Sequence, residues 1–170
     1  MPTKTPRIPR LKSGEYVKDP GYDSDVWCTY TIDMLPGEYV ACATIIDTGM
    51  LGRRVSELKI VHKDYINQKL EFKEISYDIG VDSGNCGFFD CEKFQAVKEA
   101  AKAVKKGIDP FTAKWWDISD SRELGGIFED WGVLSHSGYG DGSYVLATAR
   151  NNDSKVVAAI INYGVEEEKE

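Results

Sequence analysis

Apolar and polar residues alternate along much of this chain, a pattern typical of β-strands that bury one face. Every second residue from Val26 to Met34 is apolar, and a second run of strand type covers 38–47. Pro36-Gly37 lies between the two runs and favours a turn, so the pattern predicts a hairpin there. Further strand patterns follow over 53–63, 69–81, 132–137, 144–150 and 155–163.

The strand predicted over 69–81 changes its apolar phase partway along. Phe72 occupies an even position, whereas Ile75 and Tyr77 occupy odd ones. A change of phase turns the side chains to the opposite face of a sheet, so we expect a bulge or a break near residues 73–74.

One segment has helical periodicity instead. Apolar residues recur at intervals of three or four from Phe94 to Val104 and define a single apolar stripe. Asp90 stands where an N-cap residue is expected, and Gly107 followed by Pro110 is typical of a helix end. The sequence therefore predicts one main helix that packs its stripe on the strands.

Together these patterns predict a mostly β, α+β fold. We expect an antiparallel β-sandwich or strongly curved sheet of about eight strands, with one main helix packed on it. The turn-forming residues 151–154 predict a second hairpin near the C-terminus. The 170 residues suit one domain. We expect an extended basic N-terminal arm over 1–20, a single β-rich domain over 21–164 and an acidic C-terminal tail over 165–170.

The formal net charge of −7 belongs to the predicted domain. The arm carries five basic and two acidic side chains, which offset the four glutamates and one lysine of the tail. An acidic domain argues against binding of nucleic acid through phosphate neutralisation. No apolar run approaches the ~18 residues of a membrane span, and the first residues lack the apolar core of a secretory signal. We therefore expect a cytoplasmic protein that does not contact membranes.

The four cysteines, Cys28, Cys42, Cys86 and Cys91, show neither zinc-site nor redox-motif spacing. Without an export signal, four reduced thiols with structural roles are expected. A disulfide between Cys28 and Cys42, across the predicted hairpin, is the alternative in an oxidising compartment.

Two segments rich in glycine and aspartate are not explained by a generic β-protein fold. They cover 81–90 and 135–144, and each places small residues around aspartates at the end of a predicted strand. Glycines at such places let the backbone turn tightly or approach another group closely.

These segments, together with Pro36-Gly37-Glu38-Tyr39, resemble the bacterial domain-of-unknown-function family 4241. The matching positions are Asp82, Gly84, Phe88 and Asp90 in the first segment and the eight residues Ser137–Tyr144 in the second. The order and spacing agree from about residue 25 to residue 164. The resemblance implies a shared fold and carries no activity with it.

The second segment and the aromatic stretch before it favour a binding or protein-interaction module. Trp116 and Trp131 lie in that stretch, and Tyr139, Asp141 and Tyr144 lie in the second segment. Aromatic side chains are common interface anchors, and loops often carry binding residues. We expect these five residues to contact a protein partner or a small ligand.

The alternative function is that of a hydrolase or transferase. Asp82, Asp90 and Asp141 flank strand ends, and they would serve as general acid and base if they converged on a small pocket. His136 could also act as a base beside Ser135 or Ser137, although neighbours on a strand point to opposite faces. The sequence indicates no cofactor; three carboxylates would suit Ca²⁺ if a metal were bound. We therefore favour a binding protein over an enzyme.

Overall fold

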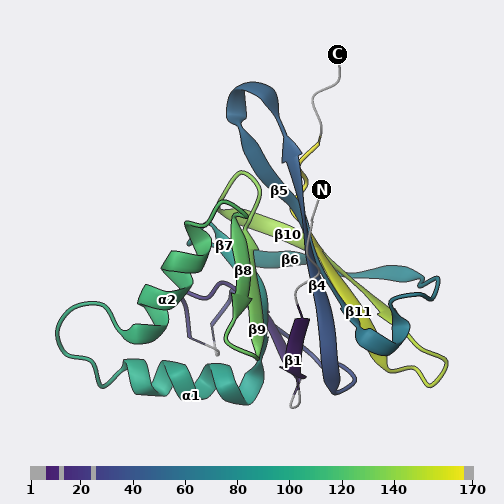
Figure 1. Ribbon diagram of the computed structural model, residues 1–170, viewed down its shortest axis with the longest axis horizontal. Helices are drawn as coiled ribbons and strands as arrows, with labels where there is room; N and C mark the ends of the chain where they lie inside the picture. Colours follow the sequence, from purple (N-terminus) through teal and green to yellow (C-terminus); the bar gives the residue numbers. More distant parts are fainter. Residues whose placement is uncertain (1–6, 12–13, 24–25, 167–170) are drawn as a thin grey trace.

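The computed structural model describes residues 7–11, 14–23 and 26–166, and its strands form two antiparallel sheets packed as a sandwich (Figure 1). The larger sheet has the order β1-β4-β5-β11-β10-β6. Its strands are β1 Arg7–Leu11, β4 Gly37–Asp47, β5 Arg53–His62, β6 Phe72–Val81, β10 Gly142–Arg150 and β11 Val156–Asn162. The predicted mostly β, antiparallel sandwich is thus confirmed.

The smaller sheet has the order β3-β2-β7-β9-β8. Its strands are β3 Thr29–Ile32, β2 Glu15–Lys18, β7 Asn85–Asp90, β9 Gly132–His136 and β8 Gly125–Phe128. Two helices, α1 Cys91–Ala101 and α2 Pro110–Ser119, cover the face of this sheet that points away from the larger one (Figure 1). Single 3-10 turns follow β4 at Gly49–Leu51 and β5 at Lys63–Tyr65.

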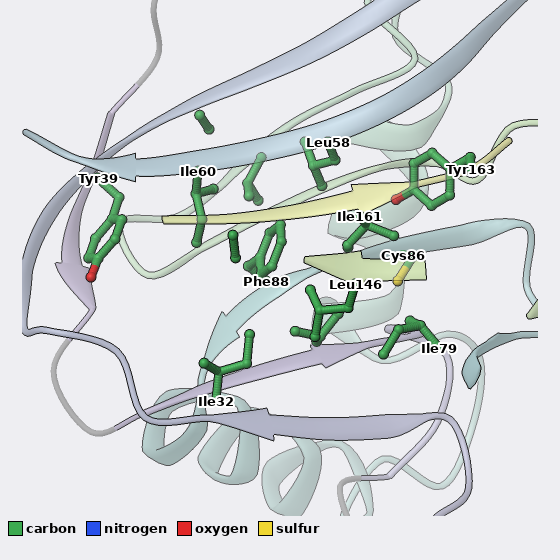
Figure 2. Packing of buried hydrophobic residues seen from close by; sticks show 14 of the residues in the cluster. Ile32, Tyr39, Leu58, Ile60, Ile79, Cys86, Phe88, Leu146, Ile161 and Tyr163 are labelled. Carbon is green, nitrogen blue, oxygen red and sulfur yellow. The ribbon is translucent and has the colours of Figure 1, made fainter. Parts of the chain in front are cut away.

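Two apolar layers result from this arrangement. The first fills the space between the sheets, where Ile60 and Ile161 of the larger sheet meet Phe88 of the smaller one (Figure 2). The second lies between the smaller sheet and the helices, and it includes Phe89 and Phe94. Successive side chains of a strand point to opposite faces, so β7 contributes Phe88 to one layer and Phe89 to the other. Every residue of β7 is therefore buried.

The predicted helix is confirmed as α1, and Asp90 caps it by accepting a hydrogen bond from the backbone N–H of Lys93 at 3.2 Å. The second helix, α2, was not expected. Asp109 caps α2 through the N–H of Thr112 at 2.9 Å, and Pro110 occupies its first turn. The apolar stripe of α2 is short, and the aromatic residues around it obscure its helical periodicity in the sequence.

The hairpin predicted at Pro36-Gly37 is wrong, because β3 and β4 belong to different sheets. The segment between them crosses from one sheet to the other. The N–H of Leu35 donates to the carbonyl of Val156 at 2.8 Å, and the Tyr39 hydroxyl donates to the carbonyl of Leu35 at 2.5 Å. Both bonds hold the crossover, and the local turn signal could not reveal the long-range bond to Val156.

Two local predictions about the sheets are confirmed. The register of β6 against β10 shifts on both sides of Ser76, between Glu74 and Ile79, close to the expected bulge. The second hairpin is formed by β10 and β11, and residues 151–154 connect them.

The domain boundary expected at residue 21 lies inside the fold. Strand β1 pairs with β4, and β2 is an inner strand of the smaller sheet, so these residues are not a separate arm. Residues 1–6 of that predicted arm lie outside the described residues, as do residues 167–170 of the predicted tail; Val165 is buried.

Replacing Gly87 by alanine is expected to lower the free energy of unfolding by roughly 2–3 kcal/mol. A Cβ atom at Gly87 would lie 2.0 Å from the carbonyl oxygen of Val133, so β7 and β9 would have to separate. Urea denaturation would measure the change. Gly126→Ala is the matched control, since its Cβ would meet only the end of the Ile118 side chain at 3.3 Å. Equal stability of the two variants would contradict this account.

Candidate functional site

The two segments rich in glycine and aspartate lie side by side in the fold. Val81 pairs with Gly142 across β6 and β10, and the N–H of Ser137 donates to the carbonyl of Gly84 at 3.0 Å. The first segment thus forms the turn from β6 to β7, and the second forms the turn from β9 to β10 against it.

A buried aspartate that the sequence analysis did not single out holds the first turn. One carboxylate oxygen of Asp19 accepts from the backbone N–H groups of Asp82 at 2.8 Å and Ser83 at 2.6 Å. The other accepts from the N–H of Gly21 at 2.8 Å, and Asp19 is 0% exposed. Asp19-Pro20-Gly21 is a turn sequence in its own right, but nothing in it points to a turn 60 residues further along the chain.

An open hollow of about 300 Å³ lies between this turn and the last turns of α2. It is lined by Ser83, Asn85, Trp115, Trp116, Ser119 and Asp120. Ser83 belongs to the turn and Asn85 begins β7, whereas three of the other residues belong to α2 and Asp120 caps its end. Its volume is at the lower end of the ~300–1,000 Å³ of small-molecule sites.

Hydrogen bonds fix the polar part of the hollow. The Ser119 hydroxyl donates to the Asn85 side chain at 2.8 Å, and the Asn85 amide donates to the carbonyl of Ser83 at 3.2 Å. His136 contacts the carbonyl of Ser119 through Nε2 at 2.7 Å. The α2 end and the turn are therefore held together before any ligand arrives.

The two tryptophans of the hollow differ in exposure. Trp116 is 45% exposed, whereas Trp115 is 5% exposed and stands nearly perpendicular to it, with ring centroids 6.0 Å apart. The indole N–H of Trp115 is buried and has no acceptor among the described residues. Buried donors normally find a partner, so this N–H is an unusual feature of the wall.

The three carboxylates proposed for catalysis are not gathered at one point. Asp82 and Asp141 flank the paired residues Val81 and Gly142, and both are exposed. Asp90 lies at the opposite end of β7, roughly 16 Å along the strand from Asn85 at about 3.3 Å per residue. The Asp82 carboxylate instead accepts a hydrogen bond from the Tyr22 hydroxyl.

The serine and histidine of the second segment have structural partners. The Ser135 hydroxyl is 3.2 Å from the Tyr163 hydroxyl, and His136 contacts α2 as described. Ser137 donates to the carbonyl of Gly140 at 2.8 Å and closes its own loop. None of these contacts pairs a serine with His136 as nucleophile and base.

The aromatic residues expected to bind a ligand occupy different surroundings. Trp116 lines the hollow, but Trp131 is 4% exposed and packs in the layer under the helices. Tyr144 donates to the carbonyls of Ser137 and Gly140, so it stabilises the Asp141 loop. Tyr139 is exposed, with the guanidinium of Arg54 5.6 Å from its ring centroid.

The surroundings of Cys86 and Cys91 do not activate their thiols. All four cysteines are free, and Cys28 and Cys86 are buried. Burial raises the pKa of the Cys86 thiol, and burial together with Glu15 and Asp90 raises that of Cys91 to about 12. A neutral thiol is a weak nucleophile and a poor metal ligand.

A buried lysine supports the segment that leads to the turn. Lys18 donates to the carbonyl of Asp23 at 2.8 Å and to the Thr29 hydroxyl at 2.9 Å, and its ammonium lies 4.9 Å from the ring centroid of Phe94. Burial lowers its pKa to about 8. Lys18 therefore ties the segment after β2 to the start of β3.

No group of three or more histidine, cysteine or carboxylate side chains in the described part of the chain could hold a metal ion. No helix among the same residues is long and apolar enough to cross a membrane.

Comparisons with protein-family models, curated proteins and solved structures found no match. The resemblance to family 4241 therefore stays a prediction, and the fold defines this chain as a helix-covered antiparallel β-sandwich.

Proposed function

We propose that this protein is a binding module, and that its hollow beside the Ser83 turn takes a small ligand rich in hydroxyl groups, such as a single sugar unit. The supporting observation is the combination of an indole face, a carboxylate and small polar groups around one open hollow. Trp116 offers the apolar face, and Asp120 offers acceptor oxygens. Trp115 also lines the hollow, and Ser83, Asn85 and Ser119 supply the small polar groups.

A sugar ring suits this arrangement because one of its faces is apolar while its rim carries hydroxyls. The apolar face would stack on Trp116, and the hydroxyls would donate to Asp120 or contact Ser83. The hydrolase alternative lacks comparable support, since Asp90 is far from Asp82 and Asp141. The free thiols agree with a cytoplasmic location, which is part of this proposal.

The test is an NMR titration with glucose, N-acetylglucosamine and adenosine as probes. A saccharide is expected to shift the indole N–H signals of Trp115 and Trp116 and the amide signal of Ser83. Trp116→Ala should abolish the shifts, and Asp120→Asn should weaken binding roughly tenfold, as the loss of a charged hydrogen bond does. Asp117→Asn is the matched control, because Asp117 is exposed on the same helix but does not line the hollow.

If adenosine alone shifted these signals, the ligand would be a planar ring compound, and the proposed sugar would be wrong. Saccharide shifts that persist in Trp116→Ala, or no shift with any probe at millimolar concentration, would contradict the proposal.

A further inference from the structure

A second surface lies at the end of β6, before the Asp82–Ser83 turn, and is built around an exposed tryptophan. Trp27 is 63% exposed, yet its ring rests on the backbone of β6. A Cβ atom at Gly80 would lie 2.1 Å from the Trp27 ring, so the glycine makes room for it. An indole that is held in place and mostly open to solvent is typical of an interface anchor.

The neighbours of Trp27 extend this surface. The Tyr22 ring lies 6.3 Å from the Trp27 ring at an angle of 61°, and the Tyr22 hydroxyl donates to the Asp82 carboxylate. That hydrogen bond raises the pKa of Tyr22 to about 12, so the phenol stays neutral. We call Tyr22, Trp27 and Gly80 the aromatic platform.

Two carboxylates lie near the aromatic platform. Asp78 lies two residues before Gly80 in β6, and Asp82 directly follows the strand and accepts the hydrogen bond of Tyr22. Both are exposed, and neither takes part in the ion pairs found among the described residues. A cation placed on the Trp27 ring would lie near the Asp82 carboxylate, which Tyr22 contacts.

Strand β6 also offers an open edge. It is the last strand of the larger sheet, and no described strand pairs with its outer side. Ile75 and Tyr77, further along the same strand, are 40% and 62% exposed. Edge strands of this kind accept an extended segment as an additional strand.

We propose that β6 and the aromatic platform form a docking surface for an extended, basic segment of a partner protein. The open edge selects an extended backbone, and the arginine or lysine side chains of that segment lie on Trp27 near Asp78 and Asp82. A second copy of this chain fits poorly, because two surfaces with the same carboxylates would face each other on molecules of net charge −7. The surface does not depend on the ligand proposed for the hollow.

The experiment uses the full chain and fluorescein-labelled peptides of eight residues that alternate arginine with threonine or glutamate with threonine. Fluorescence anisotropy is expected to show binding of the basic peptide only, with amide shifts in β6 by NMR. Trp27→Ala and the double variant Asp78→Asn, Asp82→Asn should each weaken binding roughly tenfold. The asparagine variants keep the shape of the side chains, so they test the charge even if Trp27→Ala unfolds the protein.

The controls separate this surface from the general acidity of the protein. Asp153→Asn, in the β10–β11 turn, and Met50→Ala, at the tip of the β4–β5 hairpin, change exposed residues elsewhere and should leave peptide binding unchanged. The proposal would be overturned if Asp153→Asn weakened binding of the basic peptide as much as the double variant does. It would also be overturned if the acidic peptide bound as tightly as the basic one. A dimer in sedimentation that Trp27→Ala dissociates would also overturn it, in favour of self-association.

Discussion

Replacement of Asp19 by alanine is expected to lower the free energy of unfolding by about 3–5 kcal/mol. The carboxylate of Asp19 accepts three backbone N–H bonds, two of them from the turn that carries Ser83. Removing it leaves three partly buried N–H groups without their acceptor, and an unpartnered donor costs about 1–3 kcal/mol where it is buried. Urea denaturation followed by far-UV circular dichroism would measure the loss.

Asp47→Ala is the matched control for this prediction. Asp47 accepts a single N–H bond, from Gly49 at 2.8 Å, and it is exposed. We expect that change to cost under about 1 kcal/mol, since water replaces the lost bond. Losses of similar size in both variants would show that Asp19 is not the support of the turn.

The second large effect is a loss of stability as the pH rises, caused by Glu15. Glu15 is 1% exposed, and its Oε1 atom has no hydrogen-bond partner among the described residues. Burial, with smaller contributions from Asp90 and Asp33, raises its pKa from 4.5 to about 9. The folded protein therefore holds a neutral Glu15 at neutral pH, whereas the unfolded chain holds an ionised one.

The sign follows from the protons bound in each state. Between pH 4.5 and 9 the folded state binds one proton more at Glu15 than the unfolded state does. The contribution of Glu15 to the free energy of unfolding is therefore complete below pH 4.5 and is lost as the pH rises through 9. The slope is about −1.4 kcal/mol per pH unit. From pH 5 to pH 8, wild type should lose about 4 kcal/mol relative to Glu15→Gln, which cannot ionise.

The measurement is the free energy of unfolding of both proteins at pH 5, 6, 7 and 8. Lys18 does not interfere, because burial lowers its folded pKa from 10.5 to about 8, and this affects stability only above pH 8, with the opposite sign. Tyr39, Cys91 and the carboxylates Asp33 and Asp90 face the same region, and both proteins share them. Parallel pH profiles would contradict the assignment to Glu15.

Local sequence signals predicted those elements that are stabilised by interactions between residues close in the sequence. Asp90 caps α1 with the geometry expected from its position, and residues 151–154 connect a true hairpin. The segment around Pro36-Gly37 carries an equally good turn signal, but its bonds go to Val156, far away in sequence. A turn-forming pair permits a change of direction, and the bonding partners decide where the next strand goes.

The candidate site was predicted only in part, for the same reason. Ser83 and Asn85 lie in a segment that the sequence singled out, and Trp116 was expected to bind. Trp131 was expected to bind too, but it is buried, because its aromatic side chain fits the layer under the helices. No pattern in the sequence marked Asp19, two of whose three partners lie more than 60 residues away.

The sequence by itself determined the class of fold, the capped helix α1, the late hairpin and the acidity of the domain. Each of these depends on short-range periodicity, on a cap or turn residue, or on composition. Only the tertiary structure decided that β2 carries a buried Glu15 and Lys18, that Asp19 holds the Ser83 turn, and that Trp27 rests on Gly80. These features arise where strands distant in the sequence meet, since long-range packing selects one of many pairings that the local pattern allows.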